Sequence, residues 1–347
     1  MQVSTGSMII ISWPDTRIHN AGSWYDGFMK LLGICRPDGY YDVGHAALLL
    51  VDYRSGKVLY FDFGRYHTPD GYGRVRDVQS DPELRVRTVA DVVESKIDNL
   101  KEILLEIHGN KGTHGDGKLV CSIVPDIDYD MAVASAKSIQ ARGAVPYGPF
   151  QPFGTNCSRF VATIYRSSIS SFFRRLKITN RYLYFHTPAS NVIYTHRGDN
   201  VFVVHEGQMV QESQMMRVFN NKIGDNIVPS QATKYSPHAT KKRPPTTAKK
   251  LTGIGGDTYF DISATGKKHI FLVCRYSAYG DKEIEDLYQL MSLGFDISKP
   301  FEIDYISNGL QLKVRQSGQC FLLKNTKHLR QPVPNRRLRL FKIMRNS

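Results

Sequence analysis

The chain has 347 residues, 41% of them hydrophobic and 22% charged, and its formal net charge is +14. These values are typical of a globular protein and the length is typical of two domains, and no apolar run reaches the roughly 20 residues of a membrane-spanning helix. The cysteines are odd in number, far apart and without metal-ligand spacing. We therefore expect no disulfide framework, no zinc site, no cofactor and a reducing compartment. They are Cys35, Cys121, Cys157, Cys274 and Cys320.

The N-terminus shows no export signal. It has no cationic leader, and the apolar stretch that starts at Met8 is too short for the core of a signal peptide. We therefore expect a cytoplasmic location, with export by a route that needs no classical signal as the open alternative. Met8 is also a candidate natural start, which would make residues 1–7 an addition.

Hydrophobic periodicity predicts alternating strands and helices in the first 150 residues. The expected strands are 8–13, 46–51, 58–63 and 118–124, and the expected helices are 24–32, 89–107 and 126–142. The strands 46–51 and 58–63 are joined by a short turn and predict a hairpin. Residues 64–86, rich in Gly, Asp, Arg and Tyr, predict a long loop or edge segment, and Asp126 is the expected cap of the third helix.

Cys157 stands where a loop is predicted to turn into a helix. Pro149, Pro152 and Gly154 break the chain before it, and residues 158–176 follow a helical pattern. A helix N-terminus lowers the pKa of a thiol, and the thiolate is the reactive form, so this position suits a nucleophile. The competing interpretation is a small residue packed in the core.

His45 and Asp62 are the residues expected to activate this thiol. A cysteine nucleophile needs a base, which can be remote in the sequence. His45 opens the strand 46–51, and Asp62 lies on the return strand, where an acid would hold the imidazole in the useful tautomer and stabilise its cationic form. Two alternatives remain open: His45 could be structural, and Asp62 could pair with Arg65 or Arg74.

Two segments, Gly44-His45 and Asn156-Cys157-Ser158-Arg159-Phe160-Val161, resemble the circularly permuted branch of the NlpC-type papain-like superfamily. Lecithin:retinol acyltransferase-like proteins and bacterial cysteine hydrolases belong to this branch. In that group a His begins a strand, a polar residue lies on the next strand, and an Asn-Cys-x-x-Phe motif opens a later helix. The resemblance covers roughly residues 40–170 and implies a thiol enzyme with a central antiparallel sheet and packed helices.

The chain departs from the acyltransferases at two positions. They usually place a second His on the return strand, where this chain has Asp62, with His67 as the second candidate. They often have another His after the cysteine, where this chain has Arg159. The departure weakens the case for lipid chemistry. Gln151 precedes Cys157 by six residues, the spacing at which papain-like enzymes often keep a glutamine that stabilises the oxyanion. The backbone N–H of Cys157 is the other candidate donor, and the loop around Gln151 could simply be polar.

The second half of the chain predicts a linker and a smaller domain. Short strands are expected at 182–185 and 201–204, and the periodicity then fades over residues 208–250. Beyond it we expect a helix at 283–293 and strands at 258–262, 269–276, 301–307, 310–315 and 320–324. The Gly-rich run 253–256 lacks the strand and helix that flank a phosphate loop.

The predicted fold class is therefore α+β, with three parts. They are a permuted papain-like (NlpC-type) domain at residues 8–207, a linker at 208–250, and a small α+β accessory domain at 251–347 with a basic C-terminal tail. Residues 324–345 contain no acid, so the tail either contacts an anionic polymer or membrane surface or is simply solvated. No motif supports nucleic-acid binding.

The function predicted from the sequence is that of a cysteine hydrolase, an amidase or peptidase acting on peptidoglycan or protein amide bonds. Cys157 would be the nucleophile and His45 the base, and an acyl-enzyme would form. Two alternatives are a thiol acyltransferase or lipase acting on lipid, and an inert binding module for an anionic partner. The substrate, the role of residues 251–347 and the oligomeric state do not follow from the sequence.

Overall fold

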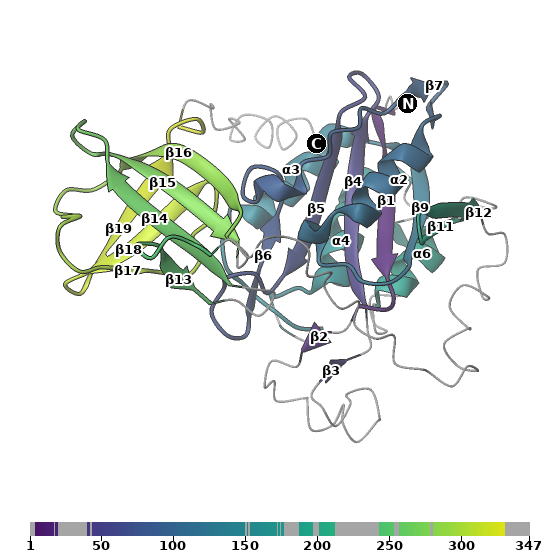
Figure 1. Cartoon of the computed structure of the whole chain (residues 1–347). Coiled ribbons are helices and arrows are strands. Elements are labelled where there is room, and N and C mark those ends of the chain that lie inside the picture. Colours follow the sequence, from purple (N-terminus) through teal and green to yellow (C-terminus); the bar gives the residue numbers. More distant parts are fainter. Residues whose placement is uncertain are drawn as a thin grey trace, which may run out of the picture. The chain divides into compact units, whose positions relative to one another are not determined.

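The structure is a computed structural model with two compact units (Figure 1). The first unit consists of Met1–Lys242 and Thr252–Thr258, and the second consists of Arg243–Leu251 and Tyr259–Ser347. It describes residues 4–16, 18–19, 40–41, 44–149, 151, 153–171, 173, 175–176, 187–196, 201–211, 243–252, 257–277 and 280–329.

An eight-stranded antiparallel sheet forms the centre of the first unit, in the order β10-β6-β5-β4-β1-β9-β11-β12. Its strands are β1 (Gly6–Trp13), β4 (His45–Asp52), β5 (Val58–Gly64), β6 (Tyr72–Arg76), β9 (Leu119–Ile127), β10 (Val145–Pro146), β11 (Val201–His205) and β12 (Gln208–Gln211). Two short pairs lie outside this sheet: β2 (Ile18–His19) with β3 (Tyr40–Tyr41), and β7 (Val92–Val93) with β8 (Lys96–Ile97).

Side-chain hydrogen bonds cap the start of most of the helices described in this unit. The helices are α2 (Leu100–Gly109), α3 (Tyr129–Gln140), α4 (Cys157–Ser168) and α6 (Pro188–Thr195), with short 3₁₀ turns η1 (Pro82–Leu84) and η2 (Lys111–Thr113). The Asp128 side chain caps α3 by accepting a hydrogen bond from the Met131 N–H at 2.9 Å. Thr187 and Ser190 form a reciprocal capping box at the start of α6.

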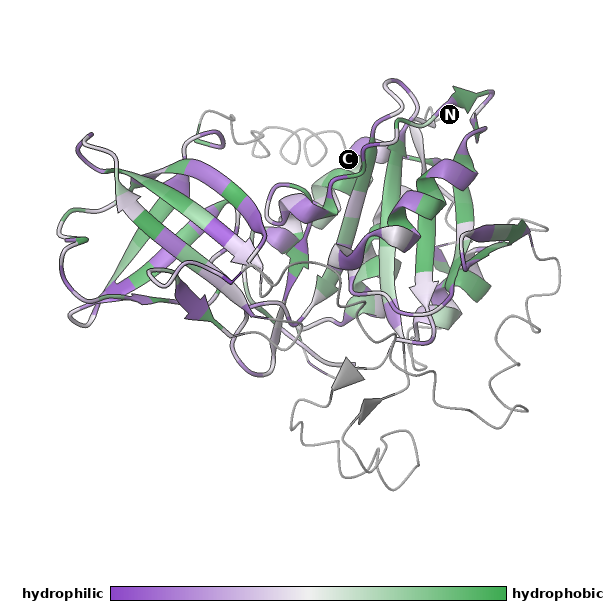
Figure 2. Ribbon diagram, viewed as in Figure 1, coloured by the Kyte–Doolittle hydropathy of each residue, from purple (hydrophilic) through white to green (hydrophobic). Residues whose placement is uncertain are grey.

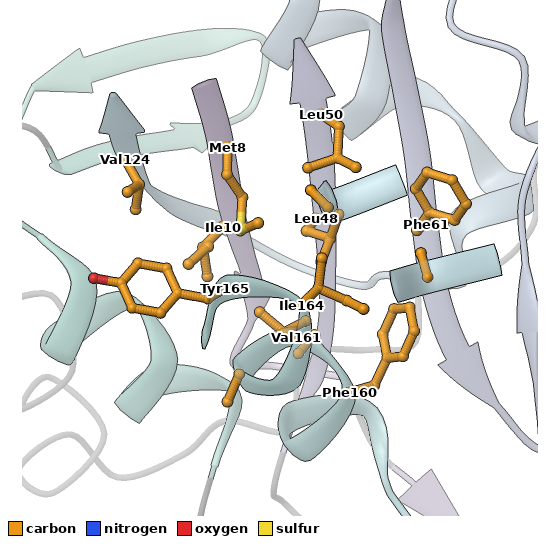
Figure 3. Close-up of a cluster of buried hydrophobic side chains, with 14 of the residues drawn as sticks. Met8, Ile10, Leu48, Leu50, Phe61, Val124, Phe160, Val161, Ile164 and Tyr165 are labelled. Carbon is orange, nitrogen blue, oxygen red and sulfur yellow. The ribbon is translucent and has the colours of Figure 1, made fainter. Parts of the chain in front are cut away.

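The central strands are buried on both faces. Along β1, Met8 and Ile10 join one hydrophobic cluster with α4, whereas Ile9 and Ile11 join a second cluster with α2. Figure 3 shows the first cluster, in which residues of β1 and β4 face residues of α4. Strands covered on both faces form continuous apolar runs in the sequence, as the green central strands of Figure 2 show.

Several predictions for this unit are confirmed and others are wrong at their limits. The strands predicted at 8–13, 46–51, 58–63, 118–124 and 201–204 are β1, β4, β5, β9 and β11. The helix predicted at 89–107 begins only at Leu100, because a tight hairpin precedes it with Glu94 and Ser95 at positive φ. The third helix starts at Tyr129, since Asp126 has a φ of +64° and β9 extends through it.

Other boundaries differ because charged or polar residues concealed regular structure. Residues 64–86, predicted as a long loop or edge segment, contain the strand β6 and the turn η1. The helix predicted at 158–176 corresponds to α4, which ends at Ser168. The predicted linker 208–250 begins with β12 and ends in β13 (Lys249–Leu251), each part of a sheet. Helix α6 was not predicted.

A seven-stranded sheet forms the second unit, in the order β13-β14-β15-β16-β19-β18-β17. The further strands are β14 (Thr258–Ala264), β15 (Ile270–Ser277), β16 (Lys282–Leu290), β17 (Glu302–Ile303), β18 (Gln311–Gln316) and β19 (Gln319–Asn325). The two edge strands approach each other, and Lys249 Nζ lies 4.6 Å from the ring centroid of Phe301, so the sheet curls on itself. Its core includes Phe260, Val273, Tyr288 and Leu323.

The helix predicted at 283–293 is wrong, because that segment is the strand β16. Ile284, Tyr288 and Leu290 are buried at even spacing, which is the period of a strand, whereas Leu287 is 43% exposed. The described part of the second unit is therefore built of strands and not of the α+β mixture expected from the sequence. The predicted strand 301–307 is reduced to β17, while β14, β15, β18 and β19 confirm their predictions.

Some predictions fall outside the described residues. They are the helix 24–32, the strand 182–185, the Gly-rich run 253–256, most of the linker and residues 330–347 of the basic tail. Within the ranges that the structure does describe, no helix is long and apolar enough to cross a membrane.

Candidate active site

Cys157 is the first residue of α4, as predicted. The Asn156 side chain caps the helix by accepting a hydrogen bond from the Arg159 N–H at 2.8 Å. The thiol therefore lies at the end of the helix where unpaired N–H groups and the helix dipole favour negative charge. Cys157 is buried, in the cluster that also contains Phe160 and Val161.

Arg159 holds the loop that leads to Cys157. Its Nη1 donates to the carbonyl oxygens of Gly148 and Pro149, both at 3.2 Å, and to that of Gln151 at 3.3 Å. One guanidinium therefore binds three carbonyl oxygens of the loop immediately before the helix. Arg159, which stands where the acyltransferases often have a further histidine after the cysteine, thus has a structural task here.

His45 begins β4 and is placed by its neighbours. Gly44 has a φ of +75°, and a Cβ there would meet the Trp13 carbonyl oxygen at 2.6 Å, so only glycine fits before the strand. Trp13 is the register partner of His45 on β1, and the two rings stack with centroids 5.7 Å apart. The imidazole is therefore fixed in a buried position at the start of the strand.

Asp62 lies beside His45, as the hairpin predicted. Asp62 is opposite Ala47 in the β4–β5 register, so the period of two brings His45 to the same face as a diagonal neighbour. The distance between His45 Nε2 and Asp62 Oδ2 is 3.3 Å. Since Nε2 is engaged by the carboxylate, Nδ1 is the ring nitrogen left for Cys157.

The electrostatics of the two residues favour a thiolate–imidazolium pair. Burial lowers the pKa of His45, but hydrogen bonds to Asp62 and Cys157 and the charges of both outweigh it and raise the pKa to about 9. Burial raises the pKa of Cys157, but the hydrogen bond and charge of His45 and the Ala46 N–H lower it below its ordinary value. Both shifts favour a proton on His45 over a proton on the sulfur.

Arg76 is the partner of Asp62, a role that the sequence did not assign to it. Its Nε donates to Asp62 Oδ1 at 3.0 Å and its Nη2 to Asp62 Oδ2 at 2.5 Å. The alternative partners expected for Asp62 were wrong, because Arg74 pairs instead with Asp81 and Arg65 lies over the Tyr147 ring. The signal that would have identified Arg76 is its register position opposite Asp62 on β6, which requires the strand to be recognised first.

Gln151 and His67 have other placements. The Gln151 carbonyl accepts hydrogen bonds from Arg159 and from the Gly154 N–H, and within the described residues no hydrogen bond joins its side chain to Cys157. Its oxyanion role stays a prediction. His67 follows β5 in a left-handed conformation with a φ of 51°. In the described ranges, no group of three or more His, Cys, Asp or Glu side chains could hold a metal ion.

The first unit is thus an α+β domain with a central antiparallel sheet, in which a cysteine, a histidine and a carboxylate come together. Residues 8–172, just under half of the chain, match the family model described as type VI secretion system effector TseH-like. Residues 248–326 match the model of the DUF6695 C-terminal domain.

The comparison with solved structures finds one similar protein, and the comparison with curated proteins finds none. The crystal structure of the type VI secretion system effector TseH is 14% identical to this chain, with a TM-score of 0.38. The alignment covers 60% of this chain and 98% of TseH.

Proposed function

We propose that the chain is a cysteine hydrolase, an amidase or peptidase in which Cys157 is the nucleophile. The observation that supports this most directly is the thiol at the start of α4, whose pKa is lowered by a buried histidine that a carboxylate holds. A buried thiol without such partners behaves in the opposite way. Cys121, in the same unit, has its pKa raised far above the ordinary value by burial.

The proposed reaction uses an acyl-enzyme. The Cys157 thiolate attacks the carbonyl carbon of an amide, and the His45 imidazolium gives its proton to the departing amine as the C–N bond breaks. A water molecule then attacks the thioester, giving a proton to His45, and the carboxylic product leaves as the thiolate re-forms. The Cys157 N–H at the helix start is available to stabilise the oxyanion.

Asp62 would orient His45 throughout and would not accept a proton. Burial raises the pKa of this carboxyl group, but the charge of Arg76 and the hydrogen bonds from His45 and Arg76 hold it well below the usual range. An ionised acceptor on Nε2 keeps Nδ1 directed at the sulfur and stabilises the imidazolium.

Hydrolysis is favoured over lipid acyl transfer by the identity of this third residue. The return strand carries Asp62 where the acyltransferases usually have a second His, and the carboxylate contacts His45 directly. The similarity of residues 8–172 to TseH-like effectors supports a role as an effector. We propose peptidoglycan peptides or protein amide bonds as the substrate class.

The test is hydrolysis by the full chain and by Cys157→Ala, His45→Ala and the matched control Cys121→Ala. Isolated peptidoglycan and a denatured protein serve as substrates, and new amino termini are detected by mass spectrometry. We expect the first two variants to lose activity by about 10³-fold or more, and Cys121→Ala to retain it because its buried thiol contacts none of the reacting groups. Hydrolysis that survives Cys157→Ala would overturn the proposal.

Binding without catalysis is distinguished by thiol reactivity. Cys320 is exposed and serves as the internal reference for an ordinary thiol. An inert Cys157 would react with iodoacetamide no faster than Cys320 at neutral pH, whereas an activated one reacts faster in wild type and loses that advantage in His45→Ala.

A further inference from the structure

Asp62 is a carboxylate with no access to water, and it depends on donors from three strands. It is 0% exposed, and its Oδ2 accepts from Arg76 Nη2 on β6, from the Tyr60 hydroxyl at 3.0 Å on β5 and from His45 Nε2 on β4. Its other oxygen accepts from Arg76 Nε. Arg76 therefore supplies the only contact that engages both oxygens among the described residues, which fixes the plane of the carboxylate.

Arg76 is itself held in one position. Its Nη1 donates to the Gly112 carbonyl at 3.0 Å, and the Tyr66 ring covers the guanidinium with its centroid 3.5 Å from Cζ. The side chain is 2% exposed. The guanidinium can therefore rotate only by breaking a backbone contact and a cation–π contact together with the ion pair.

We propose that Arg76 is a positioning residue for this site. It locks the Asp62 carboxylate so that one oxygen faces His45 Nε2, and it balances the carboxylate charge at a position that water does not reach. This proposal rests on the proposed function, because it assigns to Arg76 the support of the Cys157–His45 pair. A bidentate guanidinium is suited to the task because a single buried charge without a partner is strongly unfavourable.

Arg74 supplies a matched control on the same strand. It is buried, two residues from Arg76, and forms its own bidentate ion pair with Asp81 at 2.6 and 2.7 Å. The pair Arg74–Asp81 makes no hydrogen bond to Asp62 or His45. Arg74 Nε also donates to the Tyr66 carbonyl oxygen at 2.7 Å. Loss of Arg74 therefore reports what the removal of a buried arginine beside the Arg76–Asp62 pair does, while the hydrogen bonds to Asp62 stay in place.

The groups that face the Arg76–Asp62 pair are His45 on β4, Tyr60 on β5, Tyr66 after β5, Arg74 on β6, Asp81 before η1, His114 after η2 and Cys157 on α4. His114 is the one that also titrates in acid, since burial and the charge of Arg76 lower its pKa to about 3. A variant at Arg76 would also change His114. The test must therefore separate an effect through Asp62 from an effect through His114.

The experiment measures the rate of Cys157 alkylation by iodoacetamide against pH in the full chain, with the modified peptide identified by mass spectrometry. Without Arg76 the buried Asp62 protonates at higher pH, and the imidazolium then loses its acceptor. In Arg76→Gln we expect the acid limb of the profile to move up by about one to three pH units. Arg76→Lys keeps the charge and loses the fork, so a smaller upward shift is expected, and Arg74→Gln should keep the wild-type limb.

Two further variants, Asp62→Asn and the double variant Asp62→Asn/Arg76→Gln, complete the cycle. The double variant removes both charges together, so it leaves no unpaired buried charge and provides a measurement even if Arg76→Gln alone unfolds. The two profiles should coincide, because Arg76 acts through Asp62. A further shift in the double variant would overturn the proposal and assign the effect to His114. A folded Arg76→Gln with the profile of Arg74→Gln would also overturn it, while the wild-type profile still supports the proposed function. A wild-type Cys157 no more reactive than Cys320 would overturn both.

Discussion

At the scale of single residues, burial alone does not decide how a cysteine behaves in this molecule. Cys157 and Cys121 are both buried in the first unit, and burial raises the pKa of each. Only Cys157 faces a histidine whose imidazolium is stabilised by a carboxylate. The lowered pKa of Cys157 is therefore a property of its neighbours, and a structural role as a packed small residue does not account for it.

The pKa shifts of Cys157 and His45 predict that the pH profiles of hydrolysis and of Cys157 alkylation diverge at alkaline pH. Hydrolysis should rise as Cys157 deprotonates, at a pH lower than that of a thiol without such a partner. It should fall above about 9 as His45 loses the proton that the leaving amine needs. Alkylation needs only the thiolate, so it should stay high above that pH. The measurement is kcat/KM for a peptide substrate beside the alkylation rate, both from about pH 5 to pH 10.

The separation above pH 9 is the decisive part of this profile. If hydrolysis followed alkylation upward, His45 would not be the proton donor to the leaving group. In His45→Gln the alkylation limb should move above its wild-type position, because burial then raises the pKa of Cys157 without an opposing imidazolium.

At the scale of elements, the site is built from the first residue of a helix and the first residue of a strand. The start of α4 and the start of β4 were both recognisable, because Asn156-Cys157 and Gly44-His45 are local signals that depend on capping and on glycine conformation. The hairpin that carries Asp62 was predicted from its two apolar strands and the turn between them.

Arg76 could not be found in the same way, because β6 carries buried charges. Arg74 and Arg76 point into ion pairs with Asp81 and Asp62, so the strand lacks the alternation of apolar and polar residues that predicts one. The sequence therefore predicted a long loop or edge segment here. Strand β16 was predicted as a helix for a related reason. Ile284, Leu287 and Leu290 also fit helical spacing, and only the packing of the sheet selects the period of two.

The cap of α4 predicts a test at this scale. Asn156→Ala should lower the free energy of unfolding by about 1 kcal/mol, because the Arg159 N–H loses its acceptor. It should also slow Cys157 alkylation at neutral pH, since the thiol is the first residue of the helix that frays. The free energy is measured by urea denaturation and the alkylation rate by mass spectrometry.

Asp128→Ala at the cap of α3 is the matched control for Asn156→Ala. The Asp128 side chain accepts from the Met131 N–H in the same geometry, so a similar loss of stability is expected. Cys157 alkylation should be unchanged. Equal slowing in both variants would show that general destabilisation, and not the cap of α4, controls the thiol.

At the scale of the whole molecule, the proposed catalytic residues all lie in one of the two units. Cys157, His45, Asp62 and Arg76 all belong to the unit that holds the eight-stranded sheet. The second unit has its own sheet and its own hydrophobic core, including Phe260, Tyr288 and Leu323. The two sheets share no strand, and each has its own hydrophobic core, as independent folding requires.

This division predicts that a fragment ending at residue 242 keeps an activated thiol. All strands of the first sheet lie before that point, and the contacts that set the Cys157 pKa come from β4, β5 and β6 and from the start of α4. The fragment should therefore show the alkylation profile of the full chain, with the same acid limb, and Cys157→Ala in the fragment should abolish the signal. A fragment that folds, as judged by a cooperative urea transition, but has a shifted acid limb would place part of the thiol's electrostatic environment beyond residue 242. Because the compared quantity is the position of the limb and not the amount of product, the outcome does not depend on whether the second unit helps to bind substrate.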